Sequence, residues 1–196
     1  ARPRRDVPLP AASRDPALGG GGTAPAHLPH SLALVLCLTG LAPERGAAFM
    51  ERQSAGVDVV DALTVRFQGG ALGVIGSTGA VTPVSHTDTL EYILHGSAGH
   101  IHFDVMDGLL RLHAADGVID APVLPVDDRY PMAGPATNLV DVASGNAANG
   151  SPVAFGQRTV EILSAAYPPP ARAGTALNVP SAPPAPAHPP PWPAPT

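Results

Sequence analysis

Alternation of apolar and polar side chains across the middle of the chain constrains its fold more than any other feature. In the first alternating run, Leu63, Val65 and Phe67 point to one side of an extended chain and the residues between them to the other. A Gly-Gly pair and a second alternating run follow, a pattern typical of a β-hairpin. Further strand-turn-strand units lie over 89–105 and 109–121. We therefore predict a meander of antiparallel strands with one apolar face.

Segments with helical patterns lie on both sides of this meander. The run 26–38 is apolar on most of its sides, which predicts a buried helix. After the strands, 135–143 and 152–167 have helical spacing, and Thr137 or Asn138 is the expected cap of the first. The order of helix, strands and helices predicts an α+β fold, with a predominantly antiparallel sheet and helices packed on one face.

A nucleotide-binding half is not expected within this chain. Strands and helices do not alternate, and no G-x-G-x-x-G stands between a strand and a helix. A Rossmann domain and cofactor-binding residues are therefore not predicted here. The run Gly19–Gly22 lacks a preceding strand and a lysine, which favours a tight bend over a phosphate loop.

Composition divides the chain into three parts. Residues 1–18 are rich in Arg, Pro and Ala without an apolar period, which predicts a linker or disordered segment. Residues 19–167 have the size and patterning of one compact domain. Residues 168–196 alternate Pro and Ala, so we expect a disordered tail that folding does not need.

Charge and cysteine content limit which binding partners and which cellular compartment we expect. The net charge is −5 and no basic face stands out, so we expect no nucleic-acid partner. The most apolar run, 31–38, is far shorter than the about 20 residues that cross a bilayer, so we expect no membrane association. The single cysteine, Cys37, excludes an internal disulfide and fits a cytoplasmic protein. All eleven basic residues are Arg, which excludes a lysine base within this chain.

Polar clusters supply several candidate sites. His27 and His30 are one turn apart and share a helix face, but the pattern places no third metal ligand near them. His95, His100 and His102 surround a glycine turn, where a metal site competes with the favoured interpretation, a polar sheet face. No metal is therefore predicted. We expect the remaining candidates to have structural roles. Asp58 and Asp61 are expected to lie at a solvated strand edge. No nucleophile elbow surrounds Ser77 or Ser85, so a hydrolase triad is not predicted.

Four segments resemble one enzyme family. The run GGGTAPAHLPHSLALVLCLTG, Gly20–Gly40, is similar to a segment of the Gfo/Idh/MocA oxidoreductases, G-G-G-x-x-x-D-x-G-x-H-x-x-D-x-x-x-W-L-x-G, and matches it from the glycines through His30 without a gap. The runs GVDVVDALTVRFQGGALGVIGSTG and LEYILHGSAGHIHFD look like two of the family's hairpins. The segments GPATNLVDVASG and GQRTVEILSAAY resemble its closing helices. The resemblance covers about residues 17–167 and implies the family's C-terminal domain.

The resemblance implies a catalytic role for His30. In the family this histidine lies at the cleft between two domains and handles the substrate hydroxyl, work that suits a side chain titrating near neutral pH. His27 and Asn138 are then candidates for substrate binding, with helix capping as the alternative role of Asn138. This chain departs from the family pattern at Ala26 and Ala33, where the family has Asp, and at Leu28, where it has Gly. The change at Ala26 removes a carboxylate often placed near substrate.

Two functions follow from the resemblance. In the first, the chain is the substrate-binding and oligomerisation half of an NAD(P)-dependent oxidoreductase that acts on a sugar, polyol or similar hydroxy compound. NAD or NADP then binds the nucleotide half, whose E-K-P lysine this chain lacks, so no cofactor is expected for the chain alone and it is expected to be an inactive fragment. Its sheet face is expected to form a homo-oligomer. In the alternative, the chain is a truncated, non-catalytic assembly or binding domain. The upstream reading frame discriminates between the two.

Overall fold

The computed structural model describes residues 15–19, 21–52, 56–79, 89–129, 131–166 and 177–180. The chain divides into two compact units: the first contains residues 1–82 and 148–196, and the second contains residues 83–147. Each unit has one four-stranded antiparallel sheet. The region predicted as one domain over 19–167 thus spans parts of both.

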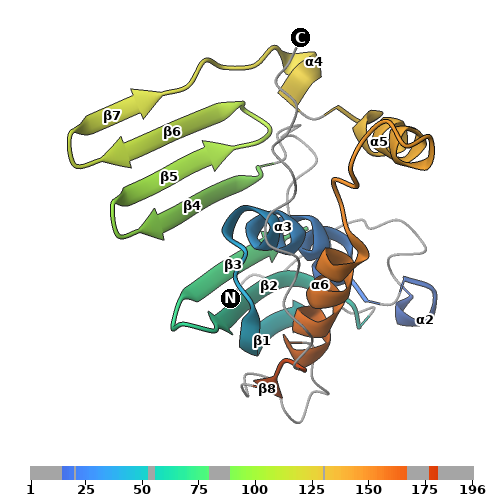
Figure 1. Ribbon diagram of the computed structural model, residues 1–196. Coiled ribbons are helices and arrows are strands. Elements are labelled where there is room, and N and C mark those ends of the chain that lie inside the picture. The colour runs from blue at the N-terminus through green and yellow to red at the C-terminus, as the bar shows by residue number, and fades with distance from the viewer. Residues whose placement is uncertain are drawn as a thin grey trace. The chain divides into compact units, whose positions relative to one another are not determined.

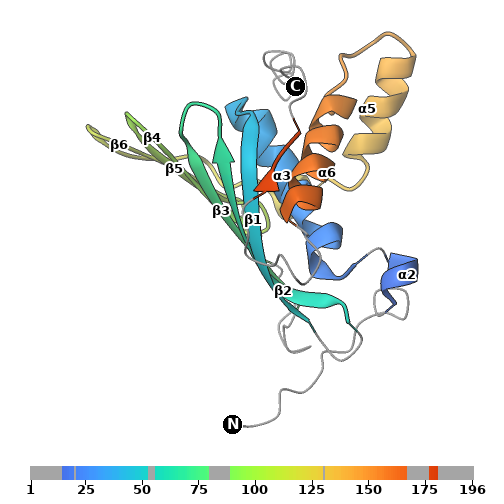
Figure 2. The same ribbon diagram turned by 90° about the horizontal axis from the view of Figure 1, so that it is seen from below.

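The first unit is a sheet with two long helices on the same face (Figures 1 and 2). The strand order is β3-β2-β1-β8. The elements, in chain order, are α2 (Pro16–Gly19), α3 (Thr23–Thr39), β1 (Pro43–Arg52), β2 (Asp58–Phe67), β3 (Leu72–Thr78), α6 (Val153–Ala166) and β8 (Leu177–Asn178). Figure 2 shows α3 and α6 side by side against β1, β2 and β3, so the opposite face of this sheet carries neither helix.

The hydrophobic core of the first unit lies between the sheet and these helices. The predicted alternation in β2 is confirmed, because Leu63, Val65 and Phe67 are all buried and the residues between them are exposed. From α3, leucines at every fourth position meet this face because a helix turns once in about 3.6 residues. From α6, Ile162 is fully buried in the same cluster. The α3 leucines are Leu28, Leu32 and Leu36.

The second unit is a meander. Its strand order is β4-β5-β6-β7, and each strand pairs with the next along the chain. One sheet face is largely apolar, and there the rings of Tyr92 and Phe103 stack at 4.7 Å between centroids. The elements are β4 (Glu91–Gly96), β5 (Gly99–Asp104), β6 (Leu109–Ala114), β7 (Gly117–Asp120), α4 (Val126–Arg129) and α5 (Gly134–Ala143).

The predicted fold class is confirmed: the described part of the chain is α+β, with antiparallel sheets and helices on one face of the first sheet. Three details differ from the sequence predictions. The strands form two sheets, and β1, whose sequence PERGAAFMER lacks strict alternation, was not predicted. The expected cap at Thr137 or Asn138 is wrong, because α5 begins at Gly134 and the Thr137 hydroxyl donates back to the Ala133 carbonyl at 3.1 Å.

Part of the tail packs on the first sheet. Leu177 and Asn178 pair with Gly46 and Arg45 of β1, and the side chain of Val179 is only 5% exposed in the core cluster. The buried guanidinium of Arg158 also donates to the Pro180 carbonyl, at 3.2 Å. The prediction of a tail without packed structure is therefore wrong for 177–180; the rest of 168–196 lies outside the described residues.

The amino end of α3 is held by a side chain from β2. The Asp58 carboxylate accepts the backbone N–H of Gly22 at 2.8 Å and that of Ala24 at 2.7 Å. These are N–H groups of the first turn, which a helix itself leaves unpaired. The contact requires glycine at position 22, since a Cβ there would lie 1.9 Å from the Asp58 carbonyl oxygen.

We predict that Val179→Ala lowers the free energy of unfolding by about 1–2 kcal/mol, because the lost methyl groups are buried against the core. Chemical denaturation measures this change. The control is Val153→Ala, at a valine that is 86% exposed, where we expect a change within about 0.5 kcal/mol. Equal effects of the two substitutions would show that the tail does not stabilise the first unit.

Gly22→Ala is expected to destabilise the chain by more than about 2 kcal/mol, because the added Cβ meets backbone that cannot rotate away. Thermal unfolding measures the loss. Gly156→Ala is the matched control: it lies inside α6 with no atom within 4 Å of the new Cβ, so alanine should stabilise the helix slightly. A Gly22→Ala protein as stable as the wild type would contradict the close approach of α3 to Asp58.

Candidate functional site

The amino-terminal half of α3 carries the two histidines singled out from the sequence. Both His27 and His30 are exposed. The leucine stripe of α3 faces the sheet, and residues 27 and 30, three apart, share a face on the other side of the helix. The structure thus brings the two imidazoles to one open helix face, near the Asp58 contact at the start of α3.

Asn138, the third candidate, lies in the second unit. It is half-buried and lies in the middle of the ten-residue helix α5, so it does not cap either end of that helix. Its assignment to substrate binding stays a prediction. The histidines belong to the first unit, and the three candidates therefore do not form one site within a single unit.

The expectation of a solvated strand edge at Asp58 and Asp61 is wrong. Asp58 is fully buried and Asp61 is 3% exposed. Asp61 is buried because it continues the alternation of Leu63, Val65 and Phe67. Asp58 is buried because of a register shift at the start of β2, where Glu51 pairs with Val60 but Arg52 pairs with Asp58. Such a bulge turns a side chain out of the regular alternation. It lets Asp58 reach α3 on the same side of the sheet as Asp61.

The environment of Asp61 is unusual for a carboxyl group. The Ser77 hydroxyl donates to its Oδ2 at 2.8 Å, while its Oδ1 is buried with no hydrogen-bond donor among the described residues. Burial raises the pKa of Asp61 to about 7, the Ser77 hydrogen bond works against this rise, and the neighbouring Asp58 adds to it. Ser77 therefore binds this carboxyl group, whereas Ser85 lies outside the described residues.

A row of histidines crosses the second sheet. His95, His100 and His113 stand opposite one another on β4, β5 and β6, with ring centroids 5.0 and 4.2 Å apart. His102, on the same side of β5, lies 2.7 Å from the Glu91 carboxylate. Desolvation, followed by the neighbouring histidines, lowers the pKa of His100, which favours its neutral form.

These histidines share their sheet face with Glu91, Arg111 and Asp120, so this face is polar, while the absence of a metal stays a prediction. Within the ranges that the structure describes, no group of three or more His, Cys, Asp or Glu side chains is arranged to hold a metal ion. Sequence reasoning missed His113, because it lies on a different strand from His95 and His100. Only the pairing of β5 with β6 brings it to them.

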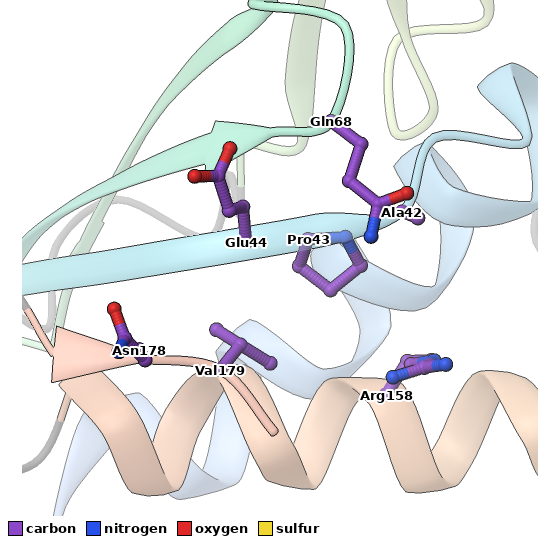
Figure 3. Close-up of a pocket in the computed structure, with 7 residues that line it drawn as sticks. All are labelled: Ala42, Pro43, Glu44, Gln68, Arg158, Asn178 and Val179. Carbon is purple, nitrogen blue, oxygen red and sulfur yellow. The ribbon is translucent and has the colours of Figure 1, made fainter. Parts of the chain in front are cut away.

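A small pocket lies at the opposite end of the core from the Asp58 contact. It has a volume of about 260 Å³ and lies between β1, α6 and β8 (Figure 3). Its lining includes Arg158, which is already paired with Glu161 at 2.8 Å. Neither His27 nor His30 lines it, so the pocket is separate from the candidate site. The lining residues are Ala42, Pro43, Glu44, Gln68, Arg158, Asn178 and Val179.

Solved structures of oxidoreductases share this fold. An oxidoreductase domain protein from Kribbella flavida is 21% identical, with a TM-score of 0.67, over 90% of this chain and 56% of that one. An oxidoreductase from Thermotoga maritima, described as putative, is 14% identical with a TM-score of 0.74, over 90% and 52%. A levoglucosan dehydrogenase solved with NADH is 16% identical with a TM-score of 0.73, over 92% and 56%. This chain thus spans about half the length of the structures it matches.

Sequence comparison identifies the family. Among curated proteins, none matches this chain significantly. No helix of the described residues is long and apolar enough to cross a membrane. The sequence model of the GFO/IDH/MocA C-terminal domain matches residues 1–102, which is more than half of the chain. Together with the shared fold, this match shows that the chain belongs to the GFO/IDH/MocA family and corresponds to its C-terminal domain.

Proposed function

We propose that this chain is the substrate-binding and oligomerisation half of an NAD(P)-dependent oxidoreductase that acts on a sugar, polyol or similar hydroxy compound in the cytoplasm. The observation that carries the proposal is the open helix face of α3, where His27 and His30 are exposed beside a helix start fixed by Asp58. An exposed imidazole on a rigid helix can reach a ligand, whereas one sealed in the core cannot.

His30 is the proposed proton acceptor. It lies in the second turn of α3, on the exposed helix face turned away from the leucine stripe. A neutral ring keeps one nitrogen free to accept the proton of a substrate hydroxyl. Oxidation of the alcohol then releases a hydride from the carbon that bears the hydroxyl group and leaves a carbonyl. The proton and the hydride therefore go to different acceptors. His27, on the same face, would orient the hydroxyl compound.

The hydride acceptor would be the nicotinamide of NAD or NADP, held by a separate nucleotide-binding half. The described part of this chain has antiparallel sheets and no strand-Gly-helix unit, so its residues do not fit the pyrophosphate of a dinucleotide. The levoglucosan dehydrogenase that shares this fold was solved with NADH, and this chain covers only 56% of it. That coverage supports a division of labour between a nucleotide half and this domain.

The outer face of the first sheet is the proposed oligomer interface. Side chains on this face include Phe49, Leu72 and Val74, which are 69%, 65% and 81% exposed. Val74 pairs across the strands with Thr64, and Phe49 pairs with Ala62, so all of them point away from α3 and α6. Exposed apolar side chains gathered on one sheet face favour association, and a second copy would cover them symmetrically.

A non-catalytic assembly domain is the second candidate. It is favoured by Ala26, which stands where the family pattern has a carboxylate, and by the lack of any lysine. Under this alternative the sheet face retains its role and His30 has none. Turnover by a protein that joins this domain to a nucleotide-binding domain therefore separates the two candidates.

In such a two-domain protein, His30→Ala is expected to lower kcat/KM by about 10²- to 10⁴-fold, the usual range for a general acid-base group. Steady-state kinetics measures the loss, and thermal unfolding should change little because His30 is exposed. His95→Ala, at an exposed histidine on β4, is the control and should retain full activity. Full activity of His30→Ala would remove its catalytic role and leave the fold assignment intact.

Val74→Asp is expected to weaken self-association by about 100-fold or more, since a symmetric interface would bring two like charges together. Sedimentation equilibrium of this chain measures the dimer dissociation constant. Val153→Asp, at an exposed valine on α6, should leave it unchanged. A wild-type chain that stays monomeric at high concentration would rule out the proposed interface.

A further inference from the structure

Two buried carboxyl groups meet where β2 begins and α3 starts. Asp58 binds the backbone of α3 with both of its oxygens, at 2.8 Å to Gly22 N and 2.7 Å to Ala24 N. These donors and the positive end of the helix dipole favour a negative charge on Asp58. Asp58 is therefore the ionised member of the pair.

Asp61 lacks such donors. One of its oxygens accepts from Ser77, and the other is buried where no donor of the described residues reaches it. An ionised carboxyl group with an unsatisfied buried oxygen is costly, and a second negative charge beside Asp58 adds to this cost. A proton on Asp61 removes the charge and converts the group into a hydrogen-bond donor. The neighbouring Asp58 carboxylate is the acceptor for this proton, and its hydrogen bond favours protonated Asp61.

We infer that Asp58 and Asp61 share one proton, and that this proton is part of the clamp that holds the amino end of α3. Asp58 is the positioning residue, because it touches the α3 backbone directly. Asp61 acts through Asp58. The inference depends on contacts inside the first unit and holds whether or not the domain binds a sugar.

The other charged groups around this pair lie toward solvent. On β1, Arg52 is registered opposite Asp58 and Glu51 opposite Val60, and both side chains are exposed. From β3, Ser77 is the polar contact of Asp61. On α3, the titratable groups His27 and His30 are exposed on the far side of the leucine stripe. Among the described residues, Asp58 is thus the charged group that acts on Asp61.

The direction of the pH dependence follows from the raised pKa of Asp61, about 7 against 3.8 for an ordinary Asp. Between these two values the folded chain keeps the proton and the unfolded chain has lost it. The stabilisation is therefore complete below about pH 4 and is lost as the pH rises through about 7. Ionisation of Asp61 then places two negative charges at the clamp and should loosen the first turn of α3.

Asp61→Asn tests the inference in the full 196-residue chain. The amide resembles the protonated carboxyl group in shape and can donate to Asp58, but it does not titrate. Between pH 5 and pH 8 we expect the wild-type melting temperature to fall by roughly 3–6 °C more than that of Asp61→Asn. We also expect amide exchange at Gly22 and Ala24, after correction for its intrinsic pH dependence, to accelerate above pH 7 only in the wild type.

Asp116→Asn, at an exposed turn residue, is the matched control and should follow the wild-type profile. Carbon-detected NMR of the wild-type carboxyl groups gives a second measurement that needs no variant, and we expect Asp61 to titrate near pH 7. Titration of Asp61 near pH 4 would overturn the inference. So would identical pH profiles for the wild type and Asp61→Asn.

Discussion

The first unit depends on a carboxylate of one strand binding the backbone of a helix that precedes it by more than thirty residues. Asp58 satisfies two N–H groups of the first turn of α3, and the missing side chain of Gly22 lets the helix start close to β2. With this end fixed, the leucine stripe of α3 lies along the sheet and its opposite face remains open. The packing of the core and the exposure of His30 thus have a common origin.

The same arrangement separates the two surfaces that the proposed function requires. Both long helices cover one face of the first sheet, so ligand-facing groups can lie on the helices while the other sheet face remains free for a partner chain. Since Phe49, Val74 and their neighbours alternate with the buried residues, a single set of strands serves the core and the outer face. A change in a core residue of β2 therefore need not alter the outer face.

Local patterns predicted most of the fold. The alternation around Val65 and the spacing of the α3 leucines report burial directly, since each depends only on the geometry of its own element. The strand β1 was missed because its charged and small residues give no such alternation, and its place in the middle of the sheet comes from its neighbours. The tail strand was missed for a related reason, since a two-residue pairing within a Pro-rich segment has no period.

The site was predicted only where one element determines it. His27 and His30 share a face because of helix geometry, and the sequence sufficed for that. The burial of Asp58 depends on a register shift between β1 and β2, the Ser77 contact of Asp61 depends on the pairing of β2 with β3, and the position of His113 depends on the pairing of β5 with β6. The sequence of a single segment does not determine its register with a neighbouring strand, so these three environments were not predictable from the sequence.

The short strand β8 also changes what happens at the border of the first sheet. Without it, β1 would present the backbone groups of Arg45 and Gly46 at an open edge, and open edges recruit strands from other molecules. The strand β8 occupies these positions, and Pro180, which has no N–H to offer, follows one residue later, after Val179. Proteolytic removal of residues 177–180 would therefore expose a template for aggregation, so this short strand protects the solubility of the sheet that it completes.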